Sequence, residues 1–266
     1  KDYLGYGTNR LPVLMALTGA GLIAADQRFV DSDGDGIGEI PIGRLPAVTA
    51  AEFKAMVDKT IGYEAAGSRS GPVILLADGP DDGGNYTADS ETLANPIEQA
   101  GHTVERIYLE QMSATEARAK LRASLQTGAD LFNYFGHAGV LALAHNLLTT
   151  SDAAALTNKA HLPVMTGMTC FMSRFELPNY TSLGESLLIN PAGGAAAVWS
   201  PGGYSYNDQA SEISAGFFKA LLTDGESRLG DAAVKALSAY VHSGGAPDVP
   251  GIYNFLGDPA SSNPTH

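Results

Sequence analysis

The sequence predicts an α/β fold, in which a mostly parallel sheet is covered by helices on both faces. Hydrophobic residues make up 44% of the 266 residues, which is enough to form a sizeable core. Several short segments, such as Val73–Ala77 and Gly194–Trp199, are apolar throughout, which is typical of strands buried on both faces. Helical patterns separate these segments, and such alternation favours a parallel sheet.

The alternation of strands and helices begins after residue 71. Predicted strands cover Val73–Ala77, Val104–Leu109, Asp130–Phe135, Pro163–Thr169, Gly194–Trp199 and Ile252–Leu256. Predicted helices cover Ala88–Ala100, Ser113–Gly128, Ser182–Asn190, Asp208–Leu222 and Leu229–His242. Gly101 suits the end of the first of these helices because glycine adopts the left-handed conformation found there.

The first 70 residues follow a different pattern. Residues 1–37 read mostly as loop, and Glu39–Arg44 is a candidate short strand. Thr49 and Glu52 have the spacing of a capping box, so a helix is expected from there onward. Glycine and serine in the segment 67–71 indicate a linker. We therefore expect a boundary between an N-terminal subdomain at 1–70 and a second subdomain at 71–266; the resemblance described below implies that the first is partial and the second catalytic.

The composition excludes several classes of protein. The chain has 16 Lys and Arg against 29 Asp and Glu, a net charge of −13, which disfavours nucleic-acid binding and suits a cationic substrate or calcium. The longest mostly apolar stretch, Leu11–Ala25, is too short to span a membrane. The single cysteine, Cys170, excludes an intrachain disulfide and a thiolate metal cluster.

Reactive side chains follow two of the predicted strands. His137 follows the strand that ends at Phe135, and Cys170 follows the strand that ends at Thr169. In parallel sheets ligands bind beyond the carboxyl ends of strands, where an imidazole and a thiol can meet. Such a pair suits acyl transfer, because the imidazole takes the thiol proton and the thiolate attacks. The alternative is a buried structural cysteine and a loop histidine.

Four segments resemble the gingipain-type cysteine peptidases of the caspase-like clan. They are Asp31–Ala47, Asn133–Gly139, Thr169–Glu176 and Tyr253–Ala260, in the order found in that family. The resemblance implies a caspase-like sheet and peptide hydrolysis. It also implies that the part of the family's first subdomain preceding these segments is missing, so we expect a longer native protein.

The resemblance also implies roles for individual residues. His137 would be the general base and acid, Cys170 the nucleophile, and the amides of Cys170 and Ala138 the oxyanion hole. Asp78, at the end of a strand, would orient the imidazole, although it could equally be a solvated loop residue. The family has glycine where this sequence has Ala138 and Ser173.

Gingipains cleave after arginine or lysine, so the resemblance raises the hypothesis of a basic P1 residue. An ungapped alignment places Tyr86 at the position of the family's selective aspartate, with Asp89 three residues later. Tyr206 matches best the aromatic residue that covers the primary pocket, and Tyr204 is the alternative. Both tyrosines could instead be exposed in a glycine-rich turn.

The spacing of acidic residues near position 31 predicts a calcium loop. Asp31, Asp33 and Asp35 alternate, Glu39 follows, and the carbonyl of Ile37 can supply a further oxygen. The bidentate glutamate of a complete EF-hand is absent, and a solvated acidic turn is the alternative. Gingipains also bind calcium, and no organic cofactor is expected.

Two classes of function follow. The first is a cysteine endopeptidase acting on protein or peptide substrates, with transpeptidation as a related reaction. The second is a non-catalytic, calcium-stabilised extracellular binding module on a peptidase-like fold. We expect a secreted or cell-surface bacterial protein that is part of a longer precursor. The other histidines, including His145, show no spacing typical of a site and are expected at helix ends or on the surface.

Overall fold

The computed structural model describes residues 11–19, 21–67 and 69–265, and its centre is a six-stranded sheet of order β4-β3-β5-β6-β7-β8. The first five strands in this order pair in parallel, whereas β8 is antiparallel to β7. The predicted α/β fold with a mostly parallel sheet is therefore confirmed. Strands β1 and β2 form a separate antiparallel hairpin.

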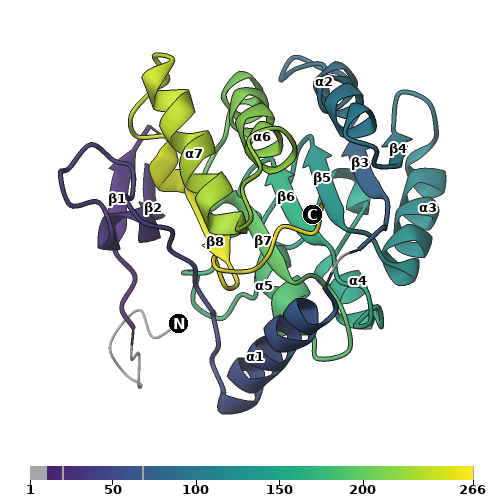
Figure 1. Cartoon of the computed structure of the whole chain (residues 1–266), viewed down its shortest axis with the longest axis horizontal. Coiled ribbons are helices and arrows are strands. Elements are labelled where there is room, and N and C mark those ends of the chain that lie inside the picture. The colour runs from purple at the N-terminus through teal and green to yellow at the C-terminus, as the bar shows by residue number, and fades with distance from the viewer. Residues whose placement is uncertain (1–10, 20, 68, 266) are drawn as a thin grey trace.

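The elements alternate along the chain as follows (Figure 1). The strands are β1 Met15–Thr18, β2 Gly21–Ala24, β3 Val73–Ala77, β4 Val104–Tyr108, β5 Leu131–Phe135, β6 Val164–Met168, β7 Ala197–Pro201 and β8 Tyr253–Leu256. The helices are α1 Ala50–Ala65, α2 Tyr86–Gln99, α3 Ala114–Thr127, α4 Thr150–Ala155, α5 Leu183–Ile189, α6 Asn207–Leu222 and α7 Leu229–His242.

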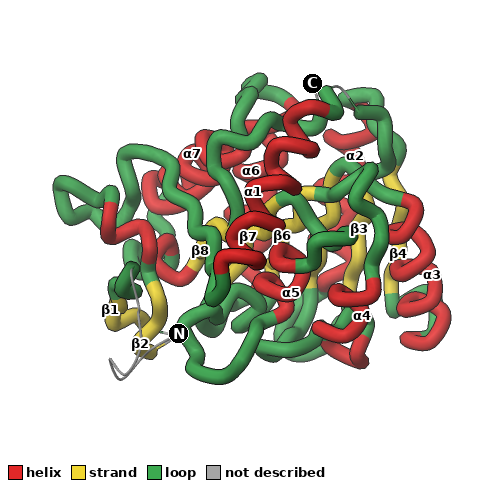
Figure 2. Tube along the Cα trace, turned by 90° about the horizontal axis from the view of Figure 1, so that it is seen from below, coloured by secondary structure: helices red, strands yellow, loops and turns green. Residues whose placement is uncertain are grey.

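Each face of the sheet buries its own apolar cluster. Along β3, Val73 and Leu75 belong to the cluster that includes side chains of α2, α6 and α7. Ile74 and Leu76 belong to the opposite cluster, with side chains of α3 and α5. The alternation follows from the two-residue period of a strand, and in Figure 2 the strands lie between helices.

Local capping signals set several helix starts. The capping box of Thr49 and Glu52 begins α1, and the one of Ser113 and Glu116 begins α3, as the sequence predicts. The helices predicted from the sequence do not include α4, although Thr149 and Asp152 form a capping box there as well. Its short length hides the periodicity that identifies longer helices.

For the N-terminal segment, one prediction is incomplete and one is wrong. The described part of 1–37 is mostly loop, as predicted, but it also contains the hairpin β1–β2; residues 1–10 of that prediction lie outside the described residues. Glu39–Arg44 forms no strand, and Arg44 makes only a single bridge to Leu256. The Glu39 carboxylate accepts a hydrogen bond from the Ser32 amide at 2.9 Å, which holds this segment in a loop, and Pro41 has no amide hydrogen for a ladder.

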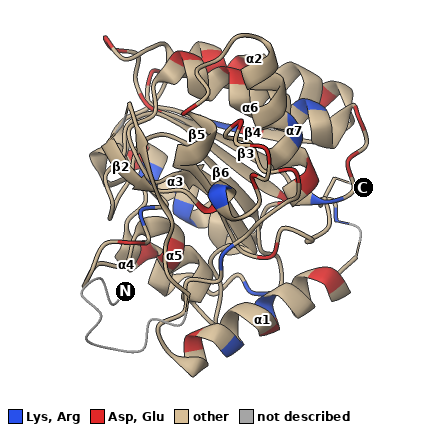
Figure 3. Ribbon diagram, turned by 90° about the vertical axis from the view of Figure 1, so that its left-hand side faces the viewer, with Lys and Arg blue, Asp and Glu red and all other residues tan. Residues whose placement is uncertain are grey.

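The charged side chains are spread unevenly over the helices. Acidic and basic residues mix along α1, whereas α2 carries acidic residues without lysine or arginine (Figure 3). Within the described residues, none of the helices combines the length and the apolar character needed to cross a membrane.

Candidate active site

The strand register brings His137 and Cys170 to one edge of the sheet. Strands β5 and β6 are parallel neighbours in which Phe135 pairs with Met168. His137 and Cys170 each stand two residues beyond this pair. Both side chains therefore leave the carboxyl ends of adjacent strands, where open α/β sheets bind ligands.

Cys170 lies in a tight turn after β6. Its Sγ donates to the Ser205 carbonyl at 3.6 Å, and it is partly buried. The next residue, Phe171, has a positive φ of 58° and donates its amide to the Gly203 carbonyl at 3.0 Å. Burial raises the pKa of the Cys170 thiol. No hydrogen bond joins Cys170 to His137, both of which lie in the described part of the chain.

The imidazole of His137 is held by an acid and a phenol. Its Nε2 lies 2.8 Å from Asp81 Oδ2 and 3.1 Å from the Tyr86 hydroxyl, which itself donates to Asp81 Oδ1 at 3.2 Å. Slight burial acts to raise the pKa of Asp81, but hydrogen bonds from Gly83 and His137 outweigh it and lower that pKa. Asp81, Tyr86 and His137 thus form a connected cluster, which we call the imidazole cluster.

Asp78 occupies a different place from the one predicted. Its buried carboxylate has Oδ2 3.5 Å from the backbone nitrogen of His137, and Oδ1 3.3 Å from Nε2 of His145. It is Asp81, three residues later, that contacts the imidazole. The sequence offered several acids in this loop, and their spacing could not show which one turns toward His137.

The backbone near Ala138 keeps a donor available. Ala138 and Leu143 form an antiparallel bridge in which Ala144 donates to the His137 carbonyl and Gly139 to the Ala142 carbonyl. In such a non-hydrogen-bonded pair, the amide of Ala138 points away from the bridge. The bridge therefore leaves that amide available to a ligand.

Ser173, three residues after Cys170, stands where the resemblance expects a glycine, and it is fully buried. Its hydroxyl lies 2.5 Å from that of Ser200, and its amide donates to the Pro201 carbonyl at 3.0 Å. The serine therefore ties the loop after Cys170 to the end of β7.

The predicted substrate residues divide between two sides of the site. Tyr86 is buried against the imidazole, as described above, rather than lining a pocket floor. Asp89, one helical turn further along α2, accepts from Asn207 Nδ2 at 2.6 Å. Tyr206 precedes Asn207 and is exposed, and Tyr204 packs edge-on against Phe171 with ring centroids 4.5 Å apart.

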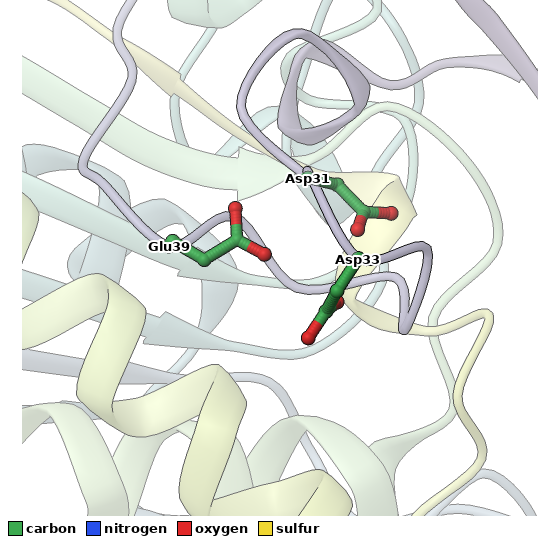
Figure 4. A group of neighbouring side chains, drawn as sticks. All are labelled: Asp31, Asp33 and Glu39. Atoms are coloured by element: carbon green, nitrogen blue, oxygen red, sulfur yellow. The ribbon is translucent and has the colours of Figure 1, made fainter.

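The acidic loop gathers three of its predicted ligands. Carboxylate oxygens of Asp31, Asp33 and Glu39 lie within 4.8 Å of one another (Figure 4). Asp35 lies outside this group and accepts from the amide of Ile37 at 2.8 Å, and the Ile37 side chain is buried. Backbone donation from Ser32 lowers the pKa of Glu39, which keeps it ionised.

Comparisons with known proteins decide the family. A model of peptidase family C25 matches residues 2–263. The chain belongs to this family. Members are cysteine peptidases, so the resemblance found in the sequence is confirmed.

One curated relative of this chain is Lys-gingipain of Porphyromonas gingivalis. It is 27% identical over 194 residues, which are 65% of this chain and 11% of the relative. The chain thus spans about a tenth of that relative's length.

Two solved structures share the fold. The Arg-specific cysteine proteinase gingipain R superposes with a TM-score of 0.81 at 19% identity, over 94% of this chain and 61% of that one. The complex of Porphyromonas gingivalis RgpB pro- and mature domains gives a TM-score of 0.80 at 19% identity, over 92% and 62% respectively. At this identity they support the fold rather than individual residue roles.

Proposed function

We propose that this protein is a cysteine endopeptidase with Cys170 as the nucleophile and His137 as the general base and acid. The observation that carries the proposal is the β5–β6 register, which delivers both residues to the same sheet edge. The Cys170 thiolate attacks the scissile carbonyl and forms a thioester, while the leaving amine takes a proton from His137. Water, activated by His137, then hydrolyses the thioester.

The imidazole cluster assigns separate roles to the two ring nitrogens of His137. Since Nε2 lies 2.8 Å from the Asp81 carboxylate, the tautomer with hydrogen on Nε2 is favoured, and Nδ1 is left to accept the thiol proton. Asp81 and Tyr86 then orient the ring, as the third member of a triad does. The amides of Cys170 and Ala138 would hold the developing oxyanion.

Thiol labelling and peptide cleavage test this proposal together. Because burial raises the pKa of the resting thiol, labelling is measured at neutral to mildly alkaline pH, where iodoacetamide should alkylate wild-type Cys170 and should react far more slowly with His137→Ala. Cys170→Ala should abolish cleavage of a labelled peptide library. Equal, slow labelling of wild type and His137→Ala would instead support the non-catalytic binding module. An added amine nucleophile that appears in the products would indicate transpeptidation.

For substrate choice we propose a basic P1 residue bound near Asp89. Asp89 lies on the same face of α2 as Tyr86, which contacts the imidazole, and α2 carries no lysine or arginine. A curated relative and a solved structure are named for lysine and arginine, respectively. Cleavage after arginine or lysine should fall at least about tenfold in Asp89→Asn, because the carboxylate charge is lost. Cleavage after alanine alone in the wild type would contradict this preference.

The acidic loop is proposed to bind one calcium ion through Asp31, Asp33 and Glu39. Three converging carboxylates suit a hard cation, and an Asp35 or Ile37 carbonyl can add oxygens. Calcium added after chelation should raise the melting temperature of the wild type, but not that of Asp33→Ala. Asp58→Asn, on the exposed face of α1, is the matched control and should keep the calcium response. No response in the wild type would reject calcium binding.

We also propose a secreted or cell-surface location in a bacterium, within a longer precursor. The bacterial relative is much longer than this chain, and a calcium loop suits extracellular ion levels. Fractionation of cells that express the native gene would test the location.

A further inference from the structure

The loop that follows His137 contains consecutive strained residues. His145 and Asn146 have positive φ values of 54° and 55°, and neither is glycine. A Cβ in this conformation costs about 1 kcal/mol, although asparagine and histidine tolerate it better than most residues. Such strain persists only where surrounding contacts impose it, and it concentrates at functional sites.

Backbone and side-chain bonds impose this conformation. Residues 138–149 form two overlapping turns, which we call the 138–149 hairpin: Ala138 bridges Leu143, and Ala142 bridges Thr149. The guanidinium of Arg118 on α3 donates to the Asn146 carbonyl. The hairpin is therefore fixed at its base and at its tip.

The strained conformation directs His145 to a buried acid. Its Nε2 lies 3.3 Å from Asp78 Oδ1, and the Asp78 side chain is only 5% exposed. The other carboxylate oxygen of Asp78, Oδ2, lies 3.5 Å from the backbone nitrogen of His137. The backbone amide of Asp78 donates to the Phe135 carbonyl at 2.9 Å. Asp78 thus lies between the backbone of His137 and the ring of His145.

The same hairpin also holds the carbonyl of His137. The amide of Ala144, next to His145, donates to that carbonyl at 2.8 Å, and the Tyr134 hydroxyl donates to it at 2.8 Å. The amide of His137 therefore has a partner in Asp78, and its carbonyl has partners in Ala144 of the hairpin and in Tyr134.

We propose that His145 is a positioning residue for the peptidase reaction, which clamps Asp78 and through it fixes the backbone that presents His137. The inference rests on the proposed function of His137. The Gly79 amide also donates to Asp78 Oδ1 at 2.9 Å, so without the His145 ring the buried carboxylate keeps backbone donors but loses the side-chain contact that fixes its orientation. A reoriented Asp78 holds the His137 amide less firmly, and small displacements of catalytic groups carry large costs in rate.

The charged and titratable groups around this clamp come from several elements. Asp78 follows β3, Tyr134 lies on β5, and Arg118 on α3 reaches the hairpin tip and pairs with Asp152 of α4. The imidazole cluster lies on the other side of His137. Variants must therefore separate a positioning effect from a change in loop stability.

Paired glycine substitutions separate these effects. His145→Gly and Asn146→Gly both relieve a positive φ, so each should keep or raise the melting temperature. Only His145→Gly removes the contact with Asp78, and its kcat for peptide cleavage should fall on the order of tenfold with little change in KM. Iodoacetamide labelling of Cys170 should slow in parallel. Asn146→Gly should retain wild-type kcat and labelling.

A double variant completes the test. In His145→Gly combined with Asp78→Asn, the loss of kcat should match that of the single variants rather than their product, because both break one clamp. Wild-type kcat in His145→Gly, or equal losses in both glycine variants, would overturn the inference. If His137→Ala leaves labelling unchanged, the proposed function fails; if His137 matters and His145 does not, only the clamp fails.

Discussion

The central sheet and the hairpin of β1 and β2 differ in how far their apolar residues are buried. Strands β3, β5, β6 and β7 are buried at every position. In the hairpin, Leu17 and Leu22 pair directly across β1 and β2, yet their exposures are 83% and 53%. The sheet is therefore stabilised by its own apolar burial, whereas the described part of the segment 11–67 adds a few buried apolar side chains, such as Ile23, Met56 and Tyr63, and is also joined to the sheet by polar contacts.

Two polar joints attach this segment to the sheet domain. Near the hairpin, Arg44 forms a buried ion pair with Asp26 and donates its amide to the Phe255 carbonyl of β8. On α1, the buried Nζ of Lys59 donates to the carbonyls of Leu187, Leu188 and Gly193. Substitutions in these joints test the contrast between the two regions.

The ion-pair joint should show the largest effect. Asp26→Ala leaves the buried Arg44 guanidinium unpaired, and we expect a loss of about 3–5 kcal/mol in the free energy of unfolding. Urea denaturation measures it. The double variant Asp26→Leu with Arg44→Met should recover most of the loss, since it removes both charges. A double variant as unstable as Asp26→Ala would contradict this explanation.

The lysine joint should show the next largest effect. Lys59→Met keeps the length of the side chain but leaves three buried carbonyls without their donor, at a cost of about 3 kcal/mol in unfolding free energy. The control is Lys54→Met on the same helix, where the side chain is 74% exposed and pairs with Asp58. That control should change stability by less than about 0.5 kcal/mol. Equal losses in both variants would show that α1 contributes through its surface.

The contribution of Lys59 should also depend on pH. Burial lowers the pKa of Lys59 from its ordinary 10.5 to about 7. Between these values the unfolded chain binds more protons than the folded one, so stability rises with pH across this window. The stability of the wild type relative to Lys59→Met should therefore increase between pH 7 and pH 9 in urea titrations. A relative stability that falls over this range would contradict the assignment.

The smallest loss of stability is expected at Gly136, just beyond the carboxyl end of β5. Gly136 has a φ of 149°, and a Cβ there would lie 2.5 Å from Asp78 Cβ and from the Tyr134 hydroxyl. Gly136→Ala should cost about 2 kcal/mol and slow the labelling of Cys170, because it displaces His137. Gly139→Ala, which meets open space, is the control and should leave both measurements unchanged.

The sequence predicted most elements of the sheet domain because their signals are local. Apolar runs mark the strands, and capping boxes at Thr49 and Ser113 mark helix starts. Thr149 and Asp152 gave the same signal for α4, which could have been found. The boundary near residue 70 stays a prediction.

The candidate site was only partly visible in the sequence. His137 and Cys170 could be chosen because strand ends in a parallel sheet converge, a rule that needs no coordinates. Tyr86 was named, but for a pocket rather than for the imidazole. His145 lacked any spacing signal, since its partner Asp78 follows β3 and lies far from it in the sequence.

What the sequence by itself determined is where chemistry can occur: a thiol and an imidazole after two buried strands, and carboxylates spaced for a cation. The tertiary structure alone decided that Asp81 rather than Asp78 meets the imidazole, that β8 runs antiparallel, and that Lys59 is buried. The physical reason is the range of the interactions. Periodicity and capping act between near neighbours, whereas the partner of a side chain depends on how distant segments pack around it.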